Sequence, residues 1–223
     1  MDTKEDSQRT ELKERIIITA LSAFKKKGIK SITMDEVASL LKISKRTLYE
    51  VFEDKETLLR ECVIYHQCHS KKMIENILAN STNVLEIILK CYQKSVEMLR
   101  DTDIRFVDEL KKYPGAHEIM VKCRKQDNDV VTDFLKKGVT QGLFRNDINY
   151  EIIQLLLRKQ LDILKNTEIC SQYSFLEVYE AIILTYLRGI STQKGADELE
   201  TFVAGYRKTR MMQNNVEIRE DDA

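Results

Sequence analysis

Residues that form turns are scarce in this chain, and this scarcity limits the folds it can adopt. Its 223 residues include seven glycines and one proline. Folds rich in β-sheet use both residue types freely in turns and bulges. The sequence therefore favours an all-α fold. Its length is enough for a small domain joined to a larger one, with ample apolar surface to bury in a core.

The N-terminus and the apolar content predict where the protein resides. The opening residues, MDTKEDSQRT, are mostly polar or charged and lack the apolar core of a signal peptide. No apolar run approaches the ~20 residues that a membrane-spanning helix needs. We therefore expect a cytoplasmic protein whose five cysteines are free thiols rather than a disulfide framework.

Charge is balanced over the whole chain but not locally. Lys and Arg total 36, as do Asp and Glu, so the net charge gives no sign of a nucleic-acid partner. Between Lys25 and Arg46, however, seven basic residues accompany two acidic ones. Such a stretch is expected where a module meets phosphates, although a solvated lysine-rich loop has the same local excess.

Two helices with clear end signals are predicted in the first part of this basic region. Apolar residues recur at helical spacings of three and four over residues 12–24, and Gly28 follows a lysine run at the expected stop. Thr33 and Glu36 then match a capping box, in which each side chain bonds the backbone of the other residue. A second helix of about two turns is therefore expected after Thr33.

A third helix is predicted directly after a tight turn. Ser44 is a natural N-cap for residues 45–52, where Leu48 and Phe52 share one face and are expected in the core. Basic residues and a tyrosine hydroxyl occupy the other faces. Two short helices in this arrangement form a helix-turn-helix, whose second helix fits the DNA major groove.

The run ITMDEVASLLKISKRTLYEVFEDKETLL, residues 32–59, resembles the DNA-binding signature of the TetR family. The similarity lies in the Thr-x-x-Glu opening, the Val-Ala pair, the Ile-Ser-x-x-Thr-Leu-Tyr block and the Phe-x-x-Lys-x-x-Leu close. The resemblance implies that residues 44–52 form the recognition helix. It implies DNA contacts from these residues: Thr33, Ser44, Lys45, Arg46, Thr47, Tyr49 and Lys55. Among them Lys45 and Arg46 would contact bases or phosphates, and the others mainly phosphates.

Two positions depart from the family pattern. Lys42 stands where members often have glycine in the turn, so we expect a strained or altered backbone there. Val51 stands where many members have His or Tyr, so the resemblance implies that one phosphate contact is missing.

The remaining chain is predicted to be helical throughout. A long helix beginning near Asp54 joins a helix-turn-helix domain, residues 11–70 with its motif at about 33–52, to a bundle at 71–213 for ligand sensing and dimerisation. Residues 214–223 are expected to form a frayed acidic tail. Segments 152–164 and 175–190 are apolar on several faces, which ordinary core packing can explain. The resemblance implies instead a homodimer interface through about 149–166 and 174–193.

The resemblance also implies a ligand pocket within the C-terminal bundle. Its candidate lining residues, each of a kind that is more often plain core, are Tyr92, Met98, Phe106, Tyr113, His117, Met120 and Phe134. A separate group, Cys62, His66 and His69, shares one helical face near Cys68. Cys and His are ligands for soft metals, but no fourth ligand is evident, and a partly buried thiol or a redox-sensing cysteine fits the same spacing. We therefore predict no metal and no cofactor.

Together these patterns predict a DNA-binding transcriptional regulator. The predicted protein is a homodimer that represses from a palindromic operator and leaves it when a small-molecule effector binds. An enzyme is not expected, because the sequence has neither a glycine-rich phosphate loop nor a Gly-x-Ser-x-Gly motif. A helical adaptor with a vestigial helix-turn-helix is the alternative, but it would not need this set of basic and hydroxyl residues.

Overall fold

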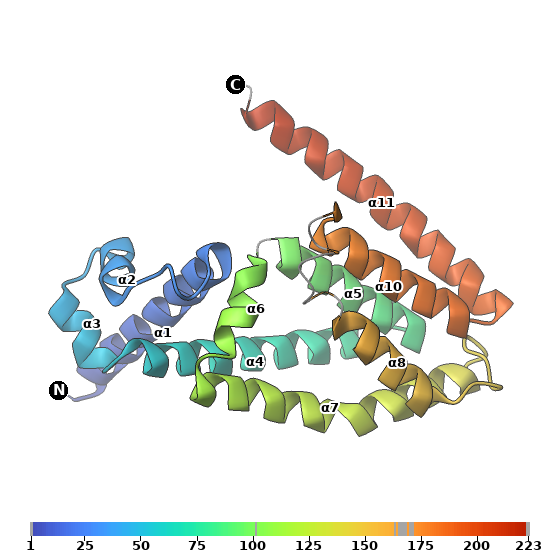
Figure 1. Ribbon diagram of the computed structural model, residues 1–223, viewed down its shortest axis with the longest axis horizontal. Coiled ribbons are helices and arrows are strands. Elements are labelled where there is room, and N and C mark those ends of the chain that lie inside the picture. Colours follow the sequence, from blue (N-terminus) through green and yellow to red (C-terminus); the bar gives the residue numbers. More distant parts are fainter. Residues whose placement is uncertain (1, 101, 163, 165–168, 170–171, 222–223) are drawn as a thin grey trace. The chain divides into compact units, whose positions relative to one another are not determined.

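The structure is a computed structural model that describes residues 2–100, 102–162, 164, 169 and 172–221. Within these residues it has helices and no strand, which confirms the predicted all-α fold. The helices of Figure 1 are α1 (Asp2–Lys27), α2 (Met34–Leu41), α3 (Lys45–Val51), α4 (Lys55–Ala79), α5 (Val84–Arg100), α6 (Ile104–Leu110), α7 (Pro114–Thr140), α8 (Tyr150–Asp162), α10 (Phe175–Ile190) and α11 (Gln193–Asp221). None of the described helices is both long and apolar enough to cross a membrane.

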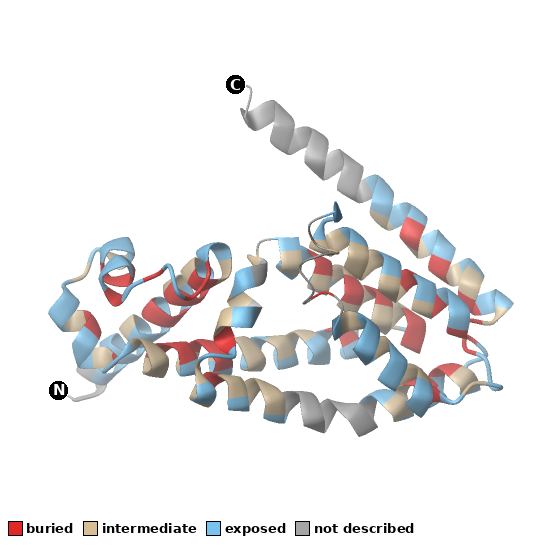
Figure 2. Cartoon of the chain, in the orientation of Figure 1, coloured by how far each residue is buried: buried red, intermediate tan, exposed pale blue. Residues whose placement is uncertain are grey.

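The chain divides into two compact units. The first unit comprises Met1–Asn76 and Ser95–Asn128, and the second comprises Ile77–Lys94 and Asp129–Ala223. Each unit has its own cluster of buried apolar residues, and Figure 2 colours the buried residues of the chain red. These units are defined by packing, whereas the predicted division at residue 70 is one of function, and that functional division stays a prediction.

The core of the first unit forms where α1 packs on α2 and α6, and α2 packs on α3. Phe24, Leu48 and Phe52 are almost completely buried there, as the apolar spacing predicts. Burial of each such side chain contributes roughly 1.5–3 kcal/mol relative to its exposure. Helix α1 ends at Gly28, whose φ of 83° is readily adopted by glycine but costly for other residues.

Two turns of the second unit, at residues 143–145 and 190–192, are joined by backbone hydrogen bonds. The backbone N–H of Arg145 donates to the carbonyl of Ile190 at 2.9 Å, and that of Thr192 donates to Leu143 at 3.0 Å. A Cβ atom at Gly138 would collide with the Phe144 ring. Close packing at this point therefore depends on a residue without a side chain.

Two helices extend beyond their apolar patterns. Helix α1 begins at Asp2, ten residues before the first apolar position at Leu12. Helix α11 continues to Asp221, through most of the segment expected to be a frayed tail. A polar segment gives no periodic signal, yet its charged residues are good helix formers and neither glycine nor proline interrupts residues 206–221. The predicted helix at 149–166 is described as α8 up to Asp162, and most of its final residues lie outside the described part.

Candidate nucleic-acid interface

The turn between α2 and α3 is fixed by caps on both sides. The Thr33 hydroxyl accepts from the Glu36 N–H at 3.2 Å, and the Glu36 carboxylate accepts from the Thr33 N–H at 2.6 Å. The Ser44 hydroxyl accepts from the Thr47 N–H at 3.0 Å and caps α3. These bonds satisfy backbone donors that a helix otherwise leaves free, so both helices begin where the sequence predicts.

Lys42 ends α2 in the left-handed conformation, with φ 56° and ψ 40°. It is the only residue other than glycine with a positive φ in the described part of the chain. The expected backbone strain at this position is therefore confirmed. This conformation produces a tight turn, because the Lys42 N–H bonds back to the last turn of α2 and the chain enters α3 after two residues.

Helix α3 has one buried side and one exposed side. Leu48 is fully buried, whereas the side chains of Lys45 and Arg46 are 65% and 90% exposed. Tyr49, one turn beyond Lys45, is 49% exposed. The helix thus presents two cations and a phenol to solvent while its apolar face holds it on the core, as a groove-reading helix requires.

Carboxylates of the chain hold both of these cations. The Lys45 ammonium forms an ion pair with Asp35 of α2, and the Arg46 guanidinium donates to Glu50 at 2.9 Å. Exposed pairs of this kind contribute only ~0.2–1 kcal/mol, so a phosphate or a base edge can replace the carboxylate at little cost. The pairs hold the cations near the helix without removing them from solvent.

Lys55, at the start of α4, differs from the other predicted DNA contacts because its ammonium is directed at the protein. It donates to the carbonyl of Ile29 and lies 5.7 Å from the centre of the Phe24 ring. Burial lowers the pKa of this ammonium from its ordinary value. Thr47 is half-buried and its hydroxyl bonds that of Ser44 at 2.7 Å. The structure thus brings Lys45, Arg46 and Tyr49 together on the exposed side of α3. The other four predicted contacts, Thr33, Ser44, Thr47 and Lys55, form hydrogen bonds within the protein. Contact of all seven residues with DNA stays a prediction.

The sequence comparisons match this region directly. Residues 16–62 match the family model described as bacterial regulatory proteins, tetR family. The chain is 27% identical over 188 residues to the HTH-type transcriptional regulator YvaF of Bacillus subtilis, covering 82% of this chain and 98% of YvaF. It is 24% identical over 157 residues to the HTH-type transcriptional repressor KstR2 of Mycolicibacterium smegmatis, covering 68% of this chain and 77% of KstR2.

The chain is a helix-turn-helix transcriptional regulator whose residues 16–62 are of the tetR type. A crystal structure of a TetR-family regulator from Agrobacterium tumefaciens has the same fold, with a TM-score of 0.67 and 14% identity over 82% of this chain and all of the other. Members of this family bind DNA operators and small-molecule ligands as dimers. The exposed face of α3 is therefore the candidate recognition surface of this regulator's helix-turn-helix.

The predicted ligand-pocket residues of the regulator are divided between the two units. Phe106, Tyr113 and Met120 pack against the core of the first unit. Met98 and the half-buried His117 also lie in the first unit. Tyr92 and Phe134 lie in the second unit. Tyr92 is 4% exposed and its hydroxyl donates to Glu180 at 2.8 Å; burial, the largest cause, raises the pKa of that phenol. The seven residues do not form one cluster within either unit, and their role as a pocket stays a prediction.

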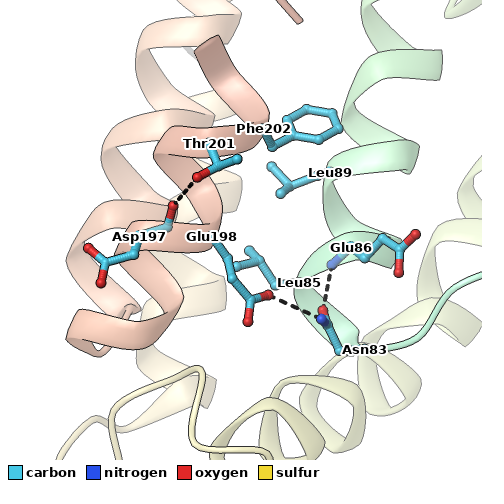
Figure 3. Close-up of a pocket in the computed structure, with 8 residues that line it drawn as sticks. All are labelled: Asn83, Leu85, Glu86, Leu89, Asp197, Glu198, Thr201 and Phe202. Atoms are coloured by element: carbon cyan, nitrogen blue, oxygen red, sulfur yellow. Dashed lines mark hydrogen bonds between the residues drawn. The ribbon is translucent and has the colours of Figure 1, made fainter. Parts of the chain in front are cut away.

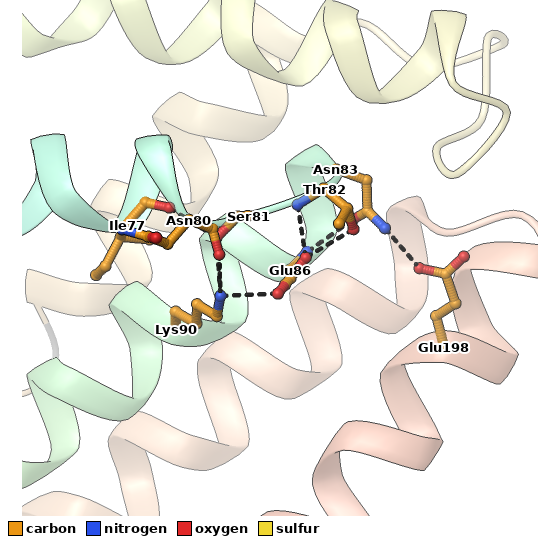
Figure 4. Close-up of polar contacts among 8 residues, drawn as sticks. All are labelled: Ile77, Asn80, Ser81, Thr82, Asn83, Glu86, Lys90 and Glu198. Atoms are coloured by element: carbon orange, nitrogen blue, oxygen red, sulfur yellow. Dashed lines mark hydrogen bonds and ion pairs between the residues drawn. The ribbon is translucent and has the colours of Figure 1, made fainter.

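A groove in the second unit runs between α5 and α11, with a volume of about 530 Å³ (Figure 3). Its lining consists of Asn83, Leu85, Glu86, Leu89, Asp197, Glu198, Thr201 and Phe202. Its polar groups are already bonded to the chain. Asn83 donates to Glu198 at 3.1 Å, and Glu86 accepts from Lys90 at 2.7 Å (Figure 4). Local periodicity did not predict this groove, because its lining residues on α5 and α11 are more than 100 positions apart in the chain.

The cysteine and histidines on α4 do not converge on a shared point. The Cys62 thiol is buried and donates to the carbonyl of Ile17 at 3.5 Å, and burial raises its pKa to about 12. His66 lies 3.2 Å from the Met98 sulfur, and burial lowers its pKa to about 4. His69 stacks on Tyr65 instead. Among the described residues no group of three Cys, His, Asp or Glu side chains could hold a metal ion. Because a thiol with a raised pKa is poorly ionised, Cys62 is also unsuited to redox sensing.

Proposed function

We propose that the regulator is a homodimeric repressor that binds a palindromic operator and leaves it when a small molecule binds. The exposed face of α3 carries this proposal, since its two cations and phenol stand on a helix held firmly on a buried core. The relative from Mycolicibacterium smegmatis is named a repressor, which supports repression as the direction of control. The proposed regulator catalyses no reaction and acts in the cytoplasm.

The proposed dimer forms through the segments at about 149–166 and 174–193, which contain α8 and α10. Ile152, Leu155 and Leu156 of α8 are each more than half exposed within one chain. Clustered apolar side chains at a surface mark an interaction site. On α10, Ala181, Thr185 and Gly189 are exposed at intervals of four, and such small residues let a second helix approach closely. A twofold dimer would place two recognition helices on the two halves of an inverted repeat.

The proposed effector works by population shift. A ligand releases the protein from DNA only if it binds the non-operator state more tightly than the operator-bound state. Sensing is assigned to residues 71–213, which contain all seven predicted pocket residues, and the chemical identity of the effector is left open.

A reporter experiment tests the direction of control. The promoter upstream of the protein's own coding sequence is fused to a reporter gene, and transcription is compared with wild-type protein, with Arg46→Ala and without the protein. Repression predicts low reporter activity with the wild type only. Higher activity with the wild type than without the protein would contradict repression and indicate activation. A matched control, Arg60→Ala, removes an exposed arginine of α4 outside the helix-turn-helix and should behave as the wild type.

A further inference from the structure

A second groove lies wholly within the first unit, away from the recognition helix. It has a volume of about 360 Å³. Helices α1 and α4, the end of α5 and the residue that precedes the α6 cap contribute its lining: Ile18, Leu21, Ser22, Lys25, Lys26, Tyr65, Met98 and Thr102. None of the predicted DNA contacts is in this set.

One part of this groove is apolar and accessible. Ile18 is 45% exposed and Met98 is 40% exposed, although both are large apolar side chains. Leu21 and Tyr65 are more deeply buried beside them. Isolated exposed apolar residues are ordinary on a protein surface, but several that line one hollow form a patch able to hold an apolar ligand.

The other part of the groove is cationic, and its main cation has no partner among the described residues. The Lys25 ammonium makes no ion pair or hydrogen bond within the described part of the chain. Asp103 donates its backbone N–H to the Lys25 carbonyl, but its carboxylate is bound to Arg105 at 2.6 Å. Burial lowers the pKa of Lys25, and no attractive charge offsets this effect. Lys26 adds a second cation, and the groove lining contains no carboxylate.

His66 does not supply this charge. Its ring nitrogen contacts the Met98 sulfur at 3.2 Å, and burial together with Lys25 keeps its pKa at about 4. The imidazole is therefore neutral near pH ~7. At that pH Lys25 and Lys26 are the only charged residues of the groove lining, so the charge of the groove is positive.

We propose that this groove binds a small amphipathic carboxylate, with its apolar chain against Ile18 and Met98 and its carboxylate on Lys25. Charge complementarity selects the ligand, because a partly buried ammonium without a partner gains more from an anion than an exposed one does. The volume lies in the range of ~300–1,000 Å³ that small-molecule sites occupy. This binding site does not depend on the proposed repression, and it can be tested without DNA.

Calorimetric titration of the full-length protein with decanoate, below its critical micelle concentration, tests the assignment. The matched probe decanol has the same chain without the charge. We expect saturable binding of decanoate at one site per chain and at least tenfold weaker binding of decanol. Lys25→Gln should weaken decanoate binding at least tenfold, whereas the control Lys122→Gln, at an exposed ion pair with Glu118, should not change it.

A second variant tests the same groove in case Lys25→Gln impairs folding. Met98 is well exposed, so Met98→Glu should leave the fold intact while placing a carboxylate in the groove, and it too should abolish decanoate binding. Equal binding of decanoate and decanol would overturn the proposal in favour of an uncharged apolar patch. Undetectable binding of decanoate to the wild type, or unchanged binding to both variants, would also overturn it.

Discussion

At the scale of single residues, Lys42 is the position where backbone strain is visible. A residue with a Cβ atom in the left-handed region costs roughly 1–2 kcal/mol, and glycine there avoids this cost but loses ~0.5–1 kcal/mol through its greater freedom when unfolded. We predict that Lys42→Gly raises the free energy of unfolding by up to ~1 kcal/mol, measured by urea denaturation. Lys42→Val should lower it, since a β-branched side chain is least tolerated at φ 56°. Equal stability of all three proteins would show that the turn is not strained.

The ion pairs of the recognition helix lead to a second prediction at this scale. Asp35 holds Lys45, so DNA binding must first separate these two charges. We predict that Asp35→Asn strengthens DNA binding by about twofold to fivefold, the equivalent of one exposed ion pair. The control Glu118→Gln removes a carboxylate from an exposed pair with Lys122 and should leave the affinity unchanged. Weaker binding by Asp35→Asn would mean that Asp35 positions Lys45 for DNA rather than competing for it.

At the scale of helices, the caps are sensitive to acid. The Thr33 N–H lowers the pKa of Glu36 at the start of α2. In α5, the hydrogen bond that Lys90 donates to the Glu86 carboxylate lowers the pKa of Glu86 to about 2. A carboxyl group with a lowered pKa stabilises the fold above its unfolded pKa, ~4.3 for glutamate. This stabilisation is lost as the pH falls toward the folded value.

We therefore predict that the thermal unfolding midpoint falls between about pH 5 and about pH 2. Glu36→Gln and Glu86→Gln should each lower the midpoint near neutral pH and lose less stability on acidification. Glu14→Gln, an exposed substitution on α1, serves as the control. Identical pH profiles for the wild type and both variants would exclude these carboxylates as the source of the acid sensitivity.

Some helix boundaries could be predicted from the sequence, and others could not. Capping residues such as Thr33, Ser44 and Asp54 mark local bonds, so the starts of α2, α3 and α4 could be predicted to within a residue. The start of α1 could not, because its first ten residues lack an apolar stripe. The Lys45–Asp35 pair and both grooves depend on how separate helices pack, which local periodicity does not specify. The family motif identified the interface, whereas the pocket residues had no comparable signal.

At the scale of the whole molecule, binding of the two halves of an inverted repeat requires a dimer. Ile152 and Leu155 are 55% and 54% exposed in one chain, and we propose that a second chain covers them. Ile152→Glu with Leu155→Glu should raise the dimer dissociation constant at least tenfold in sedimentation experiments, because a buried unpaired charge is costly. Ile74→Glu, at a comparably exposed isoleucine of α4, should leave the dimer intact. A stable dimer of the double variant would place the interface elsewhere.

We propose that the exposed face of α3 reads DNA. The most direct test is binding of purified protein to fragments of its own promoter region, measured by fluorescence anisotropy over a salt series with nonspecific competitor DNA. We expect saturable binding to one short inverted repeat, weakening steeply as salt rises, and at least tenfold weaker binding by Arg46→Ala. Binding without preference for any site, or binding that Arg46→Ala and Tyr49→Ala leave unchanged, would contradict it.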